Sequence, residues 1–200
     1  MDIREIIQKR ILVIDGAMGT MIQRFKLKEE DYRASRFAKH PVDLKGNNDV
    51  LSLTQPAIIS SIHNDYLEAG ADIIETNTFN ANSFSMADYR MQDYVYEMNR
   101  ISAQLAKEAA LKYSTTEKPR FVAGSVGPTG ISLSMSPDVN NPAYRSASFD
   151  QLSAAYAVQI NGLIDGGADM ILIETVFDTL NCKAAINAAN SCFAKNNKAL

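Results

Sequence analysis

Short apolar runs alternate with amphipathic stretches along this chain, and the alternation predicts four units of a strand followed by a helix. The strands are predicted at residues 11–14, 72–76, 121–125 and 170–174. The helices are predicted at about residues 56–69, 93–113, 149–165 and 179–195. Strands that alternate with helices in this way favour a parallel sheet whose connections are right-handed crossovers.

Residues at the predicted helix ends support these boundaries. Pro56 occupies the first-turn position that proline favours, and Gly70 ends the same helix before the next strand. Ser148 and Gln151 resemble a capping box at the start of the third helix.

Both a doubly wound open sheet and a (β/α)8 barrel begin with such units, and the connections favour the barrel. The long polar connections, at about residues 24–54 and 127–147, follow strand ends, whereas the turns from helix to strand are tight. The first strand also lacks the Gly-x-Gly-x-x-Gly turn of a dinucleotide-binding fold. We therefore expect an α/β fold of the (β/α)8 barrel type.

A sequence motif that occurs twice places a carboxylate at the end of a strand each time. Residues 70–79 read GADIIETNTF, and residues 167–177 read GADMILIETVF. Catalytic residues of barrels collect at the carboxyl ends of the strands. The repeat therefore indicates quasi-equivalent barrel units and makes Glu174 the stronger candidate for a pocket acid. For Glu75, an internal hydrogen-bonding role with Asn77 or Thr78 is an equal alternative.

The predicted units make up only part of a barrel, which needs eight units and about 250 residues. Four units account for residues 1–200, so we expect the chain to be the N-terminal half of a barrel domain. A half-barrel leaves two sheet edges open and apolar strand faces uncovered. We expect such a piece to be unstable alone, to self-associate, or to be completed by another chain.

Charge and composition exclude several classes of partner. The chain has 20 basic and 23 acidic residues, so neither a nucleic-acid nor an anionic-membrane partner is expected. It has neither a run long enough to span a bilayer nor a start typical of a secretory signal, which makes a cytoplasmic location the expectation. Cys182 and Cys192 are ten residues apart in a predicted helix, too far for a disulfide, and are interpreted as ordinary thiols.

A glycine-rich turn after the first strand is a candidate ligand site. Residues 15–20 read DGAMGT, and the backbone amides of such a turn can bind a carboxylate while Asp15 binds a cation. The pair would suit a zwitterion, although a turn whose aspartate only caps the next segment is the alternative.

Other candidate sites are weaker. The loop at residues 124–130 lacks the Gly-Lys ending of a phosphate-binding loop, and His40 and His63 are interpreted as structural. The sequence contains no recognisable Ser-His-Asp set, Cys-His pair or metal cluster.

Five segments together resemble the homocysteine-binding (homocysteine S-methyltransferase) domain of cobalamin-dependent methionine synthases (5-methyltetrahydrofolate–homocysteine methyltransferases). They match in order over essentially the whole chain, at residues 10–23, 46–56, 70–80, 124–130 and 173–178. The NNDVL stretch at residues 47–51 favours the cobalamin enzymes over relatives that use betaine or S-methylmethionine and share the barrel.

The resemblance implies roles for residues that would bind homocysteine. Asp15 and Glu174 would hold the substrate ammonium group, and the backbone amides of Gly16 and Ala17 would receive its carboxylate. Thr76, Asn77 and Phe79 would line the pocket, and Ser125 would lie nearby as a further substrate-binding residue.

The resemblance also implies cofactors that these residues do not hold. A zinc ion would stabilise the thiolate of homocysteine, and methylcobalamin on a separate domain, recharged from 5-methyltetrahydrofolate, would supply the methyl group. The zinc ligands of the family are three cysteines that cannot be mapped onto this chain, so we expect them beyond Leu200, together with the remaining barrel and the folate-, cobalamin- and reactivation-type domains. We thus expect no catalytic and no metal-binding residue within the chain, and no methyltransferase activity from this piece alone. A methyltransferase with another donor and a non-catalytic amino-acid-binding module are the alternatives.

Overall fold

A computed structural model describes residues 3–196, and its centre is a parallel sheet. The three strands are β1 (Ile73–Glu75), β2 (Phe121–Val126) and β3 (Met170–Ile173), in the order β1-β2-β3. The register places Ile74 opposite Val122 and Ser125 opposite Leu172. These strands confirm three of the four predicted ones.

The predicted first strand is only partly formed. Ile14 makes an isolated parallel bridge to Ile73, and the carbonyl of Val13 accepts hydrogen bonds from the amides of Asp72 (2.7 Å) and Ile73 (3.1 Å). Ile11 lies outside this pairing and is 87% exposed. The segment forms the edge of the sheet, and its other side pairs with no strand within residues 3–196, so a regular ladder does not extend along it.

The four long helices match the prediction to within two residues at each end. They are α5 (Pro56–Glu68), α7 (Val95–Tyr113), α8 (Phe149–Asp165) and α9 (Thr179–Lys195). Pro56 is in the first turn of α5, and Ser148 and Gln151 form the predicted capping box of α8. Within residues 3–196, no helix is both long enough and apolar enough to cross a membrane.

The predicted polar connection at residues 24–54 is more ordered than expected. It contains α3 (Glu29–Arg33), the 3-10 helix η1 (Asn48–Val50) and α4 (Leu51–Thr54). Apolar side chains scattered through it, among them Leu44, are buried against α5 and α7. Their spacing is irregular, so the segment shows no helical or strand period.

Four short helices complete the described secondary structure: α1 (Ile3–Ile6), α2 (Met18–Gln23), α6 (Ser83–Ala87) and the 3-10 helix η2 (Gln92–Tyr94). The loop at residues 127–148 contains neither helix nor strand.

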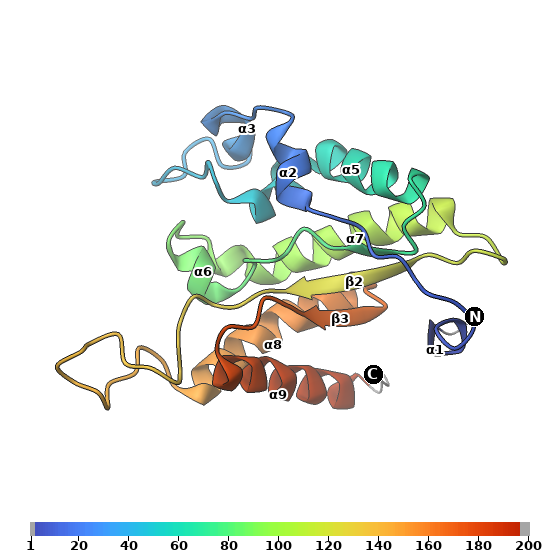
Figure 1. Cartoon of the computed structure of the whole chain (residues 1–200). Helices are drawn as coiled ribbons and strands as arrows, with labels where there is room; N and C mark the ends of the chain where they lie inside the picture. Colours follow the sequence, from blue (N-terminus) through green and yellow to red (C-terminus); the bar gives the residue numbers. More distant parts are fainter. Residues whose placement is uncertain (1–2, 197–200) are drawn as a thin grey trace.

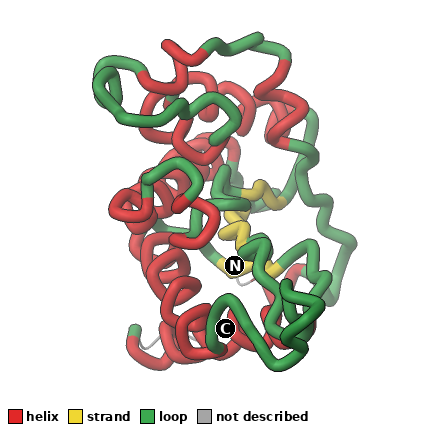
Figure 2. Tube along the Cα trace, turned by 90° about the vertical axis from the view of Figure 1, so that its left-hand side faces the viewer, coloured by secondary structure: helices red, strands yellow, loops and turns green. Residues whose placement is uncertain are grey.

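The helices cover one face of the sheet and follow one another around it. Helix α5 contacts α7, α7 contacts α8 and α8 contacts α9, a succession that runs from top to bottom in Figure 1. Figure 2 shows the helices along one side of the strands. Ile74 and Val122 pack into the core beneath these helices, as do Ile171 and Ile173. Sequential strand order with helices on one face is the arrangement of a (β/α)8 barrel, and residues 3–196 form part of such a barrel.

The opposite face and the edges of the sheet are incompletely covered. All four residues of β3 are only half-buried, and Val13 is 57% exposed. The expected exposure of apolar strand residues is therefore observed.

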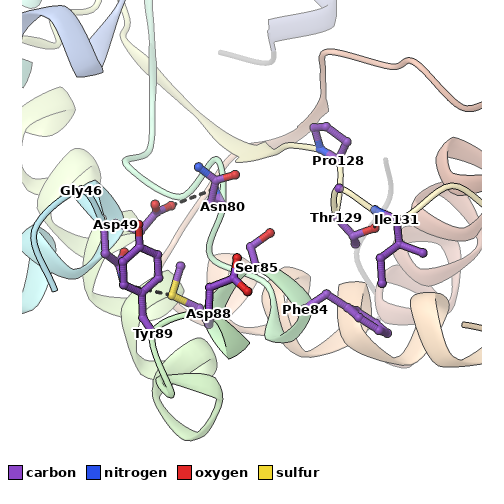
Figure 3. A pocket seen from close by; sticks show the side chains of 13 residues that line it. Gly46, Asp49, Asn80, Phe84, Ser85, Asp88, Tyr89, Pro128, Thr129 and Ile131 are labelled. Carbon is purple, nitrogen blue, oxygen red and sulfur yellow. Dashed lines mark hydrogen bonds between the residues drawn. The ribbon is translucent and has the colours of Figure 1, made fainter. Parts of the chain in front are cut away.

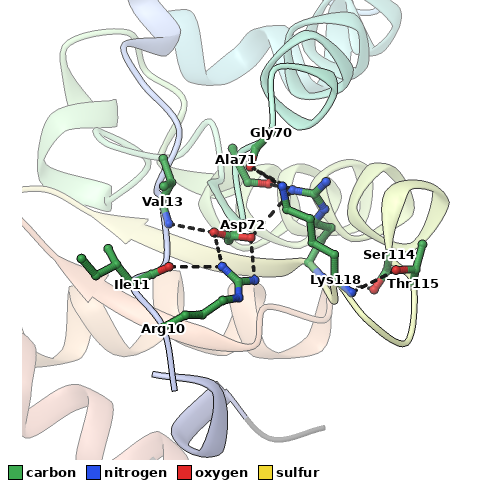
Figure 4. A network of polar contacts seen from close by, with 10 residues as sticks. Arg10, Ile11, Val13, Gly70, Ala71, Asp72, Ser114, Thr115 and Lys118 are labelled. Carbon is green, nitrogen blue, oxygen red and sulfur yellow. Dashed lines mark hydrogen bonds and ion pairs between the residues drawn. The ribbon is translucent and has the colours of Figure 1, made fainter. Parts of the chain in front are cut away.

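The aspartate of the repeated Gly-Ala-Asp motif holds adjacent strands together (Figure 4). Asp72 accepts hydrogen bonds from both terminal nitrogens of Arg10 (2.8 Å each) and from the amide of Val13 (2.9 Å). Asp169 in the second copy accepts from Lys107 Nζ (2.6 Å) and from the amide of Val122 (2.9 Å). Each aspartate precedes one strand and binds the amide of the neighbouring strand, so this half of the motif is structural.

Candidate functional site

The carboxyl ends of the strands line a cavity of about 470 Å³. All eight residues predicted to bind the substrate line it: Asp15, Gly16, Ala17, Thr76, Asn77, Phe79, Ser125 and Glu174. Further lining residues include Asn48, Asp49, Glu75 and Thr78. The structure thus brings together residues from the first turn, from both copies of the repeat and from the end of β2.

Three carboxyl groups reach this cavity from three different strand ends. Successive strand residues point to opposite faces, and Ile74 and Ile173 pack beneath the helices, so Glu75 and Glu174 point to the other face. Asp15 joins them, because its Oδ2 accepts a hydrogen bond from the amide of Glu75 (3.0 Å). No lysine, arginine or histidine is among the described lining residues, so the cavity suits a cation.

Glu75 is the acid that sequence reasoning left open and did not select. The signal for it was present, because Glu75-Thr76 in the first copy of the repeat corresponds to Glu174-Thr175 in the second. Asp49 was also missed, and no periodic pattern marks it.

The surroundings disfavour ionisation of two of these acids. Burial, together with weaker effects of the Glu75 and Glu174 charges, raises the pKa of Asp15 to about 7. Burial and the Glu174 carboxylate raise the pKa of Glu75 to about 7. Asp15 Oδ1 is buried without a hydrogen-bond partner within the protein. A bound cation would relieve both the repulsion and this unpaired oxygen.

Glu174 is held by a hydrogen bond to its side chain and is followed by a residue with an unusual backbone conformation. Ser125 Oγ donates a hydrogen bond of 2.5 Å to Glu174 Oε1. The next residue, Thr175, has φ of +54°, a conformation that β-branched residues rarely adopt. Such backbone strain concentrates at functional sites, and here it lies directly after the acid that lines the cavity.

Thr76 and Asn77 brace the site as well as line it. Thr76 Oγ1 accepts from the amide of Ser125 (3.0 Å) and lies 2.6 Å from Thr78 Oγ1. Asn77 Nδ2 donates to the carbonyl of Asn48 (2.7 Å), which ties the end of β1 to η1. Both side chains are nearly fully buried, so their hydrogen bonds hold strand ends and loops in register.

Phe79 and Gly127 bring two loops together at the cavity. The amide of Gly127 donates to the carbonyl of Phe79 (3.1 Å). A Cβ at Gly127 would lie 2.5 Å from that oxygen and 2.9 Å from the Phe79 ring, so only glycine permits this approach.

A second cavity of about 580 Å³ adjoins the first and shares Asp49 and Asn80 with it (Figure 3). Asp49 is buried, and its Oδ1 accepts a hydrogen bond from the amide of Asn80 (2.9 Å). Burial raises the pKa of Asp49 to about 6. The Asp49 carboxylate therefore ties η1 to the loop after β1 and forms the wall between the cavities.

The described residues do not form a metal site. Within residues 3–196, no group of three His, Cys, Asp or Glu side chains is arranged to hold a metal ion. Cys192 is buried in the core beneath α8 and α9, and both cysteines are free thiols. His63 is fully buried on α5 and does not line the cavity.

Comparison with known proteins gives one family and one fold. A family model described as homocysteine S-methyltransferase matches residues 12–198. Two structures of the Escherichia coli homocysteine methyltransferase MmuM have a similar fold. The metallated form has a TM-score of 0.70 at 22% identity, and the match covers 98% of this chain and 63% of that one. The oxidized form has a TM-score of 0.71 at 23% identity, with 98% and 62% covered. The chain therefore spans less than two thirds of the length of these proteins.

Proposed function

Because the chain belongs to the homocysteine S-methyltransferase family, we propose that its carboxylate-lined cavity binds homocysteine by its amino and carboxylate groups. The cavity is lined by four carboxyl groups and by no basic side chain among its described residues, and this observation carries the proposal. The substrate ammonium group would lie between Asp15 and Glu174, where it would pair with the buried Asp15 Oδ1. The substrate carboxylate would receive hydrogen bonds from the backbone amides of Gly16 and Ala17.

The reaction we propose for the whole protein is methyl transfer to the homocysteine sulfur, which forms methionine. In this proposal the methyl donor is methylcobalamin recharged from 5-methyltetrahydrofolate, because residues 47–51 resemble the cobalamin-dependent methionine synthases. A zinc ion would favour the thiolate form of the substrate. The residues described here do not fit a zinc site, so its ligands, the rest of the barrel and the cobalamin-carrying domain would lie outside residues 3–196.

In this proposal, residues 1–200 bind and orient the substrate, and other parts of the protein supply the zinc and the methyl donor. Two carboxylates fix the amino group, backbone amides fix the carboxylate, and the side chain that bears sulfur is left free to point out of the cavity. Positioning of this kind lowers the entropic cost of reaching the transition state. We expect no methyl transfer from residues 1–200 alone.

The proposal is tested by methyl transfer with the full-length protein and its Glu174→Gln variant. Loss of one charge-assisted hydrogen bond is worth about 1.5–3 kcal/mol, so kcat/KM for homocysteine should fall by about 10- to 150-fold. Glu68→Gln, on the exposed end of α5, is the matched control and should leave the rate unchanged. Parallel assays with methyltetrahydrofolate and cobalamin, with betaine and with S-methylmethionine identify the donor. Equal rates for Glu174→Gln and wild type would exclude the proposed site.

A further inference from the structure

Glu75 adds a third acid to the two that would hold the ammonium group, and a single cation cannot neutralise all three. It lies on β1 and points to the same face as Glu174 on the far side of β2. Between them β2 presents Ala123 and Ser125, which are small, so the two longer side chains can approach each other across this strand. The amide of Glu75 donates to Asp15 Oδ2 (3.0 Å), which places the third acid beside them.

We propose that Glu75 is protonated and donates a hydrogen bond to Glu174 while no amino acid is bound, and that Glu75 releases this proton to solvent when the substrate ammonium group binds. The inference rests on the proposed function of this cavity. In the empty site, the protonated carboxyl of Glu75 donates a hydrogen bond to the Glu174 carboxylate. On binding, that O–H bond breaks and its proton passes to water, while the ammonium N–H groups donate to the carboxylate oxygens.

The charges around Glu75 support proton release. The acids that act on it are Asp15 and Glu174, and Asp49 also lines the cavity. From α5, the Tyr66 hydroxyl lies near Gly16, and burial and the Asp15 charge raise its pKa, so it remains neutral near pH 7. Carboxylates that share a poorly hydrated site cannot all ionise, and an added positive charge favours their ionised forms. The pKa of Glu75, about 7, places the change near neutrality. Glu75 is therefore a positioning residue that orients Glu174 through the hydrogen bond that it donates.

Proton release can be measured by titration calorimetry of the full-length protein with methionine. Methionine carries the same amino and carboxylate groups as homocysteine but has no thiol that could release a proton of its own. Titrations near pH 7 in buffers of different ionisation enthalpy give the number of protons released. Wild type should release about half a proton or more, and its affinity should rise with pH between 6 and 8, by at most about tenfold per pH unit for one proton.

The Glu75→Gln variant should release at most about half as many protons as wild type, since a neutral amide can still donate to Glu174 but has no proton to lose. Its affinity at pH 6 should stay within about threefold of wild type. Glu68→Gln is the control and should release as many protons as wild type. Infrared difference spectra of wild type with and without methionine provide a measurement that needs no variant, and should show the loss of a protonated-carboxyl band on binding.

The outcomes separate this inference from the function on which it rests. If methionine and homocysteine both fail to bind wild type, the proposed function fails and this inference fails with it. If methionine binds but Glu75→Gln releases as many protons as wild type, or the infrared band is unchanged by binding, only the role of Glu75 is overturned.

Discussion

Replacing Asp72 with asparagine should destabilise the protein far more than the equivalent change in the second copy of the repeat. Asp72 is 2% exposed and binds both terminal nitrogens of Arg10 as well as the amide of Val13. Removing one partner of a buried ion pair costs about 3–5 kcal/mol. Because the Arg10 side chain is 36% exposed and can be rehydrated, we expect a lower value of about 2–3 kcal/mol.

Asp169→Asn is the matched control, because Asp169 has the same neighbours in the motif but its side chain is 27% exposed. Its ion pair with Lys107 resembles a surface pair, so the substitution should cost at most about 1 kcal/mol. Urea unfolding of the full-length protein, followed by circular dichroism, measures both free energies. Equal losses for the two variants would refute the reasoning that burial of Asp72 makes the difference.

The pH dependence of the Asp72 variant gives an independent check. The Arg10 guanidinium lowers the pKa of Asp72 below its ordinary value. The stability that this interaction supplies is therefore complete above the unfolded pKa of about 4 and is lost as the pH falls through the folded pKa. The difference in unfolding free energy between wild type and Asp72→Asn should accordingly shrink in acid.

Three further predictions concern the site and the core. Gly127→Ala should destabilise the protein by about 1–3 kcal/mol, because the added Cβ would clash with the Phe79 carbonyl. The affinity for methionine should fall as well, and an unchanged thermal unfolding temperature would contradict this prediction. Asp15→Asn should weaken methionine binding yet raise the melting temperature of the protein at pH 8. The pKa of Asp15 is raised in the folded state, so the stability that protonated Asp15 contributes to the fold is lost as the pH rises from about 4 to about 7, and asparagine does not ionise. A lower melting temperature at pH 8 would count against it. His63→Leu should be stabilising, because the ring of His63 is buried with neither nitrogen paired, and calorimetric melting that shows a loss of stability would exclude that view.

The sequence predicted the long elements well because each had a regular period and a boundary signal. Helix α9 spans Thr179–Lys195, the predicted residues, and α8 begins at the capping box formed by Ser148 and Gln151. Periodicity could not reveal the short helices at residues 29–54, since their buried residues are spaced irregularly. Nor could it show that the segment at residues 11–14 pairs only around Ile14, because pairing depends on a neighbour that local sequence does not specify.

Two sequence signals marked acids of the candidate site, and the family resemblance supplied its other residues. The repeat marked Glu174, and the glycine-rich turn marked Asp15, and both line one cavity. Asp49 escaped notice because it lies on η1, outside any periodic segment, and only the tertiary fold brings it to the cavity, where it accepts a hydrogen bond from the amide of Asn80. Glu75 was left open although it corresponds to Glu174 in the repeat, because the repeat alone does not show that the two carboxyl groups line the same cavity.

The most direct test of the proposed function compares the binding of homocysteine with that of 4-mercaptobutyrate, which has the thiol and the carboxylate but no amino group. Titration calorimetry of the full-length protein measures both dissociation constants under the same conditions. If Asp15 and Glu174 hold the ammonium group, the analogue should bind at least about 100-fold more weakly, because two charge-assisted hydrogen bonds are lost and the acids remain uncompensated. Equal affinity of the two ligands would contradict the assignment of this cavity as the amino-acid site.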